Sequence, residues 1–239
     1  MSNIGPTLIR SKLLVPSPAG LLHRSRLCQT LEQGLDRKLT LVSAPAGYGK
    51  TSALVDFAQA VSLPVCWYTV DERDRDLNLF VRYLVGAIGE RFSGFGERTR
   101  EALEARVSDL FREPTAVVGD LVNEMLDVDQ DFILVLDNFE VLDGAFGIEE
   151  FTRRFVEVLP PNCHLMIGSR VLPDVPVTHL VAKRQLVGVT EQHLRFKPDE
   201  IRELLARSQI EVSEAQARAI ANNAEGWITG VLLILDLLR

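Results

Sequence analysis

The chain has 239 residues, 46% of them hydrophobic and 25% charged, and 26 lysines and arginines against 33 aspartates and glutamates give a net charge of −7. This composition is typical of a globular chain with one large domain and room for a small second one. It disfavours direct binding to nucleic acid or to an anionic membrane, since both require a positive surface.

Features spread along the chain predict a cytoplasmic protein. No apolar run reaches the ~20 residues that a membrane-spanning helix needs, and the N-terminal sequence lacks the apolar core of a signal peptide. Cys28, Cys66 and Cys163 are widely separated and odd in number. They are interpreted as small buried residues in a reducing compartment rather than as a metal or disulfide framework.

Five short apolar runs predict strands, and helical patterns lie between them. The expected strands are 39–43, 65–70, 132–136, 164–168 and 185–189. The expected helices are 51–60, 77–88, 103–111, 117–126 and 148–156. Continuous apolar strands suit a parallel sheet that is covered on both faces. The alternation predicts an α/β fold of the P-loop NTPase type, with a mostly parallel, doubly wound sheet.

From Lys197 onward the pattern is helical only. Pro198 suits a first helical position, and further helices are expected over 213–223 and from Trp227 to the end. We therefore predict a nucleotide-binding domain over residues 1–195 and a small helical domain over residues 196–239. The last run is apolar on nearly all sides and needs cover, which predicts that this polypeptide is a piece of a longer one.

Residues 44–51 read Ala-Pro-Ala-Gly-Tyr-Gly-Lys-Thr, a P-loop (Walker A) pattern with alanine in place of its first glycine. Gly47 and Gly49 allow the backbone to curl so that its N–H groups point at phosphate oxygens, and the following helix adds its positive end. Lys50 is expected to bridge the β- and γ-phosphates, and the Thr51 hydroxyl to ligate Mg²⁺. The expected nucleotide contacts are Pro45, Ala46, Gly47, Tyr48, Gly49, Lys50, Thr51 and Ser52. The alternative is a glycine-rich turn with a surface lysine.

A P-loop predicts a second motif, a buried strand that ends in a metal-orienting carboxylate. The run 132–136 ends at Asp137, which is assigned that role. At the next position, Asn138 stands where hydrolytic P-loop proteins often have a second acid. An amide cannot accept a proton from water, so slow turnover is the favoured interpretation. Glu140 is close enough to assist, although a solvated loop residue is the plainer alternative.

Arg170 follows the fourth expected strand, and its guanidinium suits a γ-phosphate sensor because its planar fork matches phosphate oxygens. The alternative is a surface arginine that bonds loop carbonyls. The candidate catalytic residues are thus Lys50, Asp137 and Arg170, and the candidate Mg²⁺ ligands are Thr51 and Asp137.

With these motifs assembled, the chain resembles the nucleotide-binding core of the STAND class of P-loop ATPases, in particular the MalT-like, LuxR-type bacterial regulators. The P-A-G-Y-G-K-T form of the loop is more specific than the general pattern. The segments that carry the resemblance are 10–16, 23–27, 41–51, 67–72, 80–84, 168–173, 193–196 and 225–231.

The resemblance implies a molecular switch that is closed and inactive with ADP, and that opens and self-associates with ATP and an inducer. It implies that the tail from about Lys197 closes over the nucleotide. It also implies that Arg24 and Arg26 lie near the adenine and ribose. Members of the class carry further winged-helix, superhelical sensor and often DNA-binding domains, so this segment is not itself expected to contact DNA.

Some positions depart from the class or leave two interpretations open. Asn138 replaces a second acid, and Glu140 replaces a common histidine, which weakens the expectation of hydrolysis more than that of binding. Ile228 stands where related switch domains often have a proline that touches adenine. Asp71 and Glu72 match an acidic pair that faces either the γ-phosphate and metal or only forms an acidic turn.

Two function classes remain from the sequence. The first is an ATP/ADP-binding switch of a transcriptional or signalling regulator that needs Mg²⁺ and hydrolyses ATP slowly at most. The second is a P-loop enzyme, either an efficient ATPase or a kinase, although residues 171–181 lack the arginine cluster of a kinase lid. Guanine is disfavoured as the base, because no Asn-Lys-x-Asp or Thr-Lys-x-Asp stretch is present.

Overall fold

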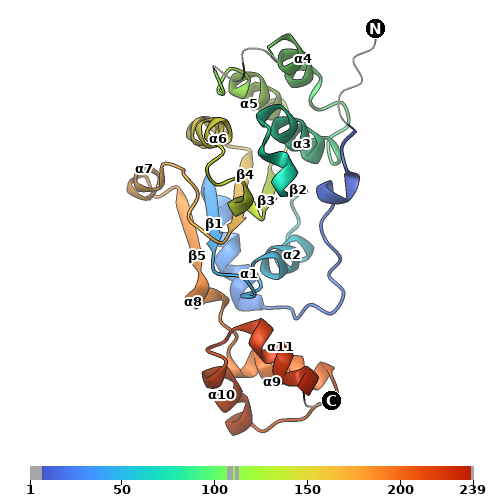
Figure 1. The fold of residues 1–239 in the computed structure, drawn as a ribbon, viewed down its shortest axis with the longest axis vertical. Helices are drawn as coiled ribbons and strands as arrows, with labels where there is room; N and C mark the ends of the chain where they lie inside the picture. Colours follow the sequence, from blue (N-terminus) through green and yellow to red (C-terminus); the bar gives the residue numbers. More distant parts are fainter. Residues whose placement is uncertain (1–6, 107–109, 111–112, 238–239) are drawn as a thin grey trace.

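A single five-stranded parallel sheet organises the protein (Figure 1). The structure is a computed structural model that describes residues 7–106, 110 and 113–237, with side chains as far as residue 233. The strand order is β2-β3-β4-β1-β5. The strands are β1 (Leu39–Ser43), β2 (Val65–Thr69), β3 (Phe132–Asp137), β4 (Cys163–Ser169) and β5 (Leu186–Thr190). The predicted strands and the doubly wound α/β fold are confirmed, and each strand pairing is parallel.

Eleven α-helices are formed by the described residues. They are α1 (Ser25–Glu32), α2 (Lys50–Ala60), α3 (Leu77–Gly89), α4 (Glu97–Ala105), α5 (Val118–Leu126), α6 (Phe146–Val158), α7 (Val177–Ala182), α8 (Glu191–Leu194), α9 (Pro198–Arg207), α10 (Glu214–Asn223) and α11 (Ile228–Leu237). The predicted bounds 103–111 of one helix are wrong, because α4 begins at Glu97 and ends at Ala105. Val107 and Phe111, which were part of that pattern, lie outside the described residues.

Alternating strand residues face two separate cores. Leu134 and Leu136 of β3 point toward α3, α5 and α6, whereas Ile133 and Val135 point toward α1 and α2. Because both faces of the sheet are covered, the strands are apolar at successive positions, as a parallel sheet requires. Trp67 is completely buried on the α1–α2 side.

The three helices α9, α10 and α11 enclose a third, smaller core, at the bottom of Figure 1. Ile201, Leu205 and Val231 are buried in it, and Leu22 joins them from the segment that precedes α1. The predicted boundary between residues 195 and 196 stays a prediction. In the part of α11 whose side chains are described, Val231 is buried, whereas Leu232 and Leu233 are 45% and 55% exposed.

The carboxyl ends of the strands meet at one edge of the sheet. Ser43 at the end of β1 lies opposite Ser169 on β4 and Thr190 on β5, and Thr69 lies opposite Asp137. This edge is where ligands bind in open parallel sheets. Among the described residues, no helix combines the length and the apolar character needed to cross a membrane.

Candidate nucleotide-binding site

The loop between β1 and α2 curls tightly at two glycines. Gly47 and Gly49 have φ angles of 80° and 77°, a left-handed conformation that residues with a Cβ adopt at a cost. Gly49 is the residue that precedes the first turn of α2. The loop therefore ends at the positive end of an 11-residue helix, which is the geometry of an anion-binding loop.

Lys50 lies inside this loop and is buried. Its Nζ donates hydrogen bonds to the carbonyl oxygens of Ala44 at 2.7 Å and Pro45 at 3.0 Å. Burial lowers the pKa of Lys50, and Arg170 lowers it further, whereas the carboxylates of Glu140 and Asp137 raise it. Neutral carbonyls are weaker partners for an ammonium than an anion is, so this lysine is available for a phosphate.

Asp137 and Thr51 are in direct contact at the end of β3. The Thr51 hydroxyl donates to Asp137 Oδ2 at 2.8 Å. Asp137 Oδ1 is buried and has no hydrogen-bond partner among the described residues, and burial is the main cause that raises the pKa of this carboxyl. Gly168 leaves room for it, since a Cβ there would lie 2.8 Å from Oδ1. An unpaired carboxylate oxygen beside a hydroxyl fits Mg²⁺, which prefers hard oxygen ligands.

Arg170 is held by Glu140. The Arg170 Nε and the Glu140 Oε1 lie 2.8 Å apart, and the Arg170 backbone N–H donates to Oε2 at 3.1 Å. The arginine side chain is 58% exposed, but the glutamate side chain only 12%. Glu140 is thus ion-paired rather than free in solvent. Asn138, two residues earlier, has a left-handed backbone with φ of 61°, which asparagine tolerates better than most residues.

The beginning of α11 contacts the phosphate loop. The Trp227 indole Nε1 donates to the Ala46 carbonyl at 3.1 Å, and the Thr229 hydroxyl donates to the Gly47 carbonyl at 3.1 Å. A Cβ on Gly47 would lie 2.5 Å from Thr229 Oγ1 and from Trp227 Nε1. Gly47 therefore permits both the curl of the loop and the close approach of the C-terminal helices.

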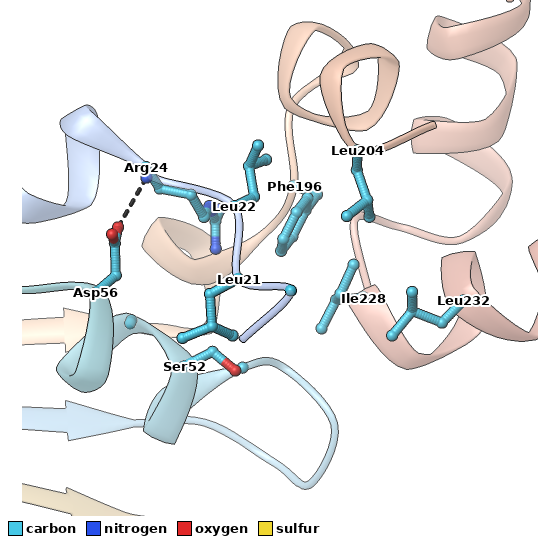
Figure 2. Close-up of a pocket in the computed structure, with 12 residues that line it drawn as sticks. Leu21, Leu22, Arg24, Ser52, Asp56, Phe196, Leu204, Ile228 and Leu232 are labelled. Carbon is cyan, nitrogen blue, oxygen red and sulfur yellow. Dashed lines mark hydrogen bonds between the residues drawn. The ribbon is translucent and has the colours of Figure 1, made fainter. Parts of the chain in front are cut away.

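A pocket lies beside the loop, between the segment before α1, the first turns of α2, and α9 and α11 (Figure 2). It encloses about 540 Å³ of free space, part of it open to solvent. Leu21 and Ser52 lie on one side of it, and Phe196, Leu204 and Ile228 on the other. Its lining is mainly apolar, which suits a flat heterocycle.

The two arginines of the predicted adenine site differ in placement. Arg24 lines this pocket, where its guanidinium carbon lies 3.9 Å from the centre of the Phe196 ring. It also pairs with Glu200 at 2.9 Å, and burial lowers its pKa. Arg26 donates to Glu200 and to the His193 carbonyl. Through Glu200, both arginines therefore fasten the beginning of α1 to α9.

The remaining predicted positions lie around the loop. Burial and the nearby Glu191 carboxylate raise the pKa of Tyr48, and Ser52 lines the pocket. Asp71 accepts the backbone N–H of Arg73 at 2.8 Å and pairs with Lys12 at 3.1 Å. These contacts favour the acidic-turn interpretation of Asp71.

Sequence comparisons relate the chain to transcriptional regulators. The HTH-type transcriptional regulator MalT of Yersinia pestis (strain Pestoides F) is 30% identical over 229 residues, which cover 95% of this chain and 25% of that protein. MalT of Serratia proteamaculans (strain 568) is 31% identical over the same length and with the same coverage. The chain thus spans about a quarter of the length of the curated relatives it matches. No model of a known protein family matches it.

Comparison of folds gives a consistent result. A signal transduction ATPase with numerous domains (STAND) with a tetratricopeptide repeat sensor, from Pyrococcus horikoshii, superimposes with a TM-score of 0.52 at 14% identity. The match covers 87% of this chain and 28% of that one. At this identity the likeness concerns the fold alone, and it identifies the fold as that of the P-loop ATPases.

Proposed function

We propose that this chain, which is homologous to a segment of the MalT-type transcriptional regulators, is an ATP/ADP-binding switch module with slow hydrolysis at most. The observation that carries the proposal is the contact of Trp227 and Thr229 with the carbonyls of the phosphate loop. A helical segment seated on the loop can respond to what the loop binds. A switch requires such a contact between the nucleotide-binding loop and a second segment, whereas nucleotide binding alone does not.

The groups at the sheet edge support binding of a nucleotide di- or triphosphate with Mg²⁺. Lys50 supplies a buried positive charge next to the positive end of α2. Thr51 and Asp137 would hold Mg²⁺, which neutralises charge on the phosphate oxygens when it is bound. The pocket beside Arg24 and Ile228 would hold the adenine. Pro45, Ala46 and Tyr48 would contribute backbone around the phosphates.

Two features support slow rather than efficient hydrolysis. Asn138 has no carboxylate with which to accept a proton from water, and Glu140 is already paired with Arg170. A general base must reach the proton that it removes and must be free to accept it. The alternative function, an efficient ATPase or kinase, would need an unpaired carboxylate at this position. Neither Asn138 nor Glu140 supplies one.

A switch depends on differential affinity rather than on chemical speed. Moving a population from almost wholly closed to almost wholly open needs a preference of about 10⁴-fold, or about 5.5 kcal/mol. A γ-phosphate contacted by the terminal N–H groups of Arg170, whose Nε stays paired with Glu140, would supply part of this preference. We propose that the whole regulator is cytoplasmic and that it self-associates when ATP is bound. The segment formed by this chain would not contact DNA directly.

Arg170→Ala is expected to weaken MgATP binding by about tenfold or more, since a hydrogen bond to a charged group contributes about 1.5–3 kcal/mol. MgADP binding should change less than about twofold, because the diphosphate lacks the group that this arginine would contact. Isothermal titration calorimetry with both nucleotides measures the two losses. Arg154→Ala, which removes an exposed arginine paired with Glu157, is the matched control. Equal losses for ATP and ADP would contradict the sensor role.

A further inference from the structure

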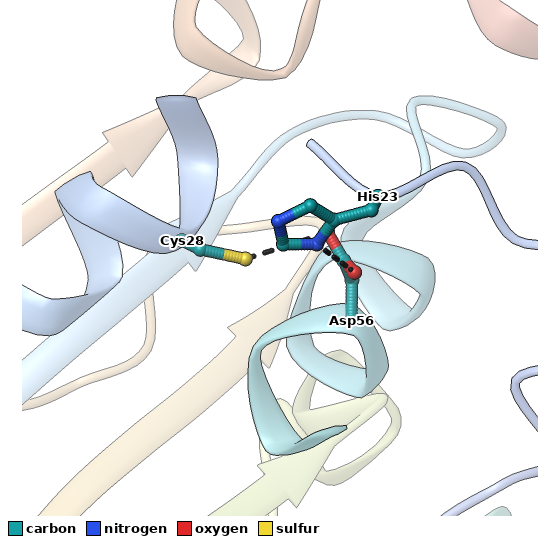
Figure 3. Close-up of side chains that lie close together, drawn as sticks. All are labelled: His23, Cys28 and Asp56. Atoms are coloured by element: carbon teal, nitrogen blue, oxygen red, sulfur yellow. Dashed lines mark hydrogen bonds and ion pairs between the residues drawn. The ribbon is translucent and has the colours of Figure 1, made fainter. Parts of the chain in front are cut away.

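Three side chains with different metal-binding atoms converge between α1 and α2 (Figure 3). His23 precedes α1, Cys28 lies in its first turn, and Asp56 lies on α2. The ligand atoms of these residues all lie within 4.8 Å of one another. His23 Nδ1 is 2.9 Å from Asp56 Oδ1, and Cys28 Sγ is 3.4 Å from Asp56 Oδ2.

These separations are close to those of a tetrahedral zinc site. With bonds of about 2.0–2.1 Å to nitrogen and oxygen and about 2.3 Å to sulfur, two ligands of one ion stand about 3.3–3.5 Å apart. The His23 Nδ1–Asp56 Oδ1 distance of 2.9 Å is about half an ångström shorter than this, and the Cys28 Sγ distance of 3.4 Å is to the other carboxylate oxygen, Oδ2. Binding would draw the three ligand atoms, which lie within 4.8 Å of one another, around one ion.

The surroundings orient the carboxylate and leave one side of the cluster open. Asp56 Oδ2 accepts the Arg24 backbone N–H at 2.7 Å, which leaves Oδ1 to serve as a ligand. Such outer contacts fix the direction of a ligating group. The His23 side chain is 54% exposed, so an ion has a route from solvent and a fourth position for water. Three protein ligands and one water is a common open zinc arrangement.

The charges of the three ligands would match that of a divalent ion. Burial and the nearby Asp56 carboxylate raise the pKa of Cys28 to about 12, so the thiol is protonated at neutral pH. A bound divalent cation reverses that preference, because a coordinated thiol is deprotonated. A thiolate and a carboxylate then balance the two positive charges, while His23 binds as the neutral imidazole. One proton leaves Cys28 for the solvent as the sulfur–metal bond forms.

We propose that His23, Cys28 and Asp56 form a binding site for Zn²⁺ that links α1 to α2. The mixture of thiolate, imidazole and carboxylate favours zinc over the hard cations Mg²⁺ and Ca²⁺. The site is separate from the Thr51–Asp137 pair at the end of β3. Because Asp56 and Arg24 also line the pocket of Figure 2, the ion would stiffen one wall of it.

The test uses Co²⁺ as a spectroscopic substitute for Zn²⁺ on the purified chain after removal of metals with a chelator. Binding is expected to produce a thiolate-to-cobalt charge-transfer band that saturates at one ion per chain and disappears when Zn²⁺ is added. Cys28→Ser should abolish the band, although Cys66 and Cys163 remain. His23→Ala, a change at an exposed side chain, should weaken Zn²⁺ binding by at least about tenfold.

Two results would overturn the proposal. One is the absence of a saturable charge-transfer band in the unaltered chain. The other is a band that persists in Cys28→Ser or a Zn²⁺ affinity that is unchanged in His23→Ala, since either would place the ion elsewhere. His179→Ala, which removes an exposed histidine on α7, should leave the Co²⁺ and Zn²⁺ titrations unaltered. Thermal unfolding of each variant without metal verifies that the fold is retained.

Discussion

Lys50→Ala is expected to weaken the binding of both MgADP and MgATP by at least about 100-fold. The ammonium is buried inside the loop, where its electrostatic interaction with a phosphate is screened less than at the surface. Loss of a charged partner in such a site leaves the phosphate charge without compensation. The fold should remain, because the Ala44 and Pro45 carbonyls that lose the ammonium can be solvated by water entering the loop. Calorimetry with each nucleotide measures the loss.

Lys183→Ala is the matched control for this experiment, because Lys183 is an exposed lysine beyond α7. Its removal should leave both affinities within about twofold. Circular dichroism and thermal unfolding of the two variants separate a binding defect from a folding defect. Unchanged ADP affinity in a folded Lys50→Ala chain would mean that the phosphates bind elsewhere.

The second large effect concerns stability. Lys12→Met is expected to lower the free energy of unfolding by about 3 kcal/mol, because removing one partner of a buried ion pair leaves a buried charge uncompensated. Lys12 contacts Asp74, which is 1% exposed, and Asp71, and its ammonium lies 4.2 Å from the centre of the Tyr83 ring. The pair therefore holds the segment before α1 against β2 and α3. Urea unfolding monitored by circular dichroism measures the change.

A second substitution tests whether the uncompensated charge is the cause. Asp74→Asn removes the charge while its side-chain oxygen can still accept the Asp71 backbone N–H, so adding it to Lys12→Met should restore part of the stability. Arg98→Met breaks an exposed pair with Asp127 and should cost less than about 1 kcal/mol. If Lys12→Met costs no more than Arg98→Met, the buried pair does not anchor this segment.

The local signals of the sequence identify the sheet and the elements of the site that are contiguous in the chain. The apolar run that ends at Asp137 and the loop that precedes Lys50 can each be recognised from a few consecutive residues. Their contact through Thr51 follows from the P-loop pattern once β1 and β3 are known to share a sheet edge. Such features need no knowledge of packing beyond the alternation of strands and helices.

Contacts between distant segments are the part that could not be predicted. The pairing of Glu140 with Arg170 depends on β3 and β4 being neighbours, and Glu140 alone has the appearance of a solvated loop residue. The contacts of Trp227 and Thr229 with the loop span more than 180 residues. They depend on how α11 packs against the sheet edge, and no periodicity in the sequence encodes that placement.

The same reasoning applies to the predicted arginine pair and to the cysteines. The resemblance predicts Arg24 near the adenine and ribose, whereas its contacts with Phe196 and Glu200 depend on the position of the C-terminal helices. The sequence alone indicates that Cys28 is a small buried residue. Its proximity to Asp56, 28 residues away on another helix, is a property of the packing of α1 on α2.

The most direct measurement of the central claim is the nucleotide retained by the purified chain. The chain is incubated with MgADP, passed through a desalting column and denatured, and the released nucleotide is identified and quantified by chromatography. Close to one ADP per chain is expected, because the contacts of α11 and Trp227 with the loop would slow release. Recovery of no adenine nucleotide would contradict the claim that this sheet edge and the C-terminal helices form a closed nucleotide site.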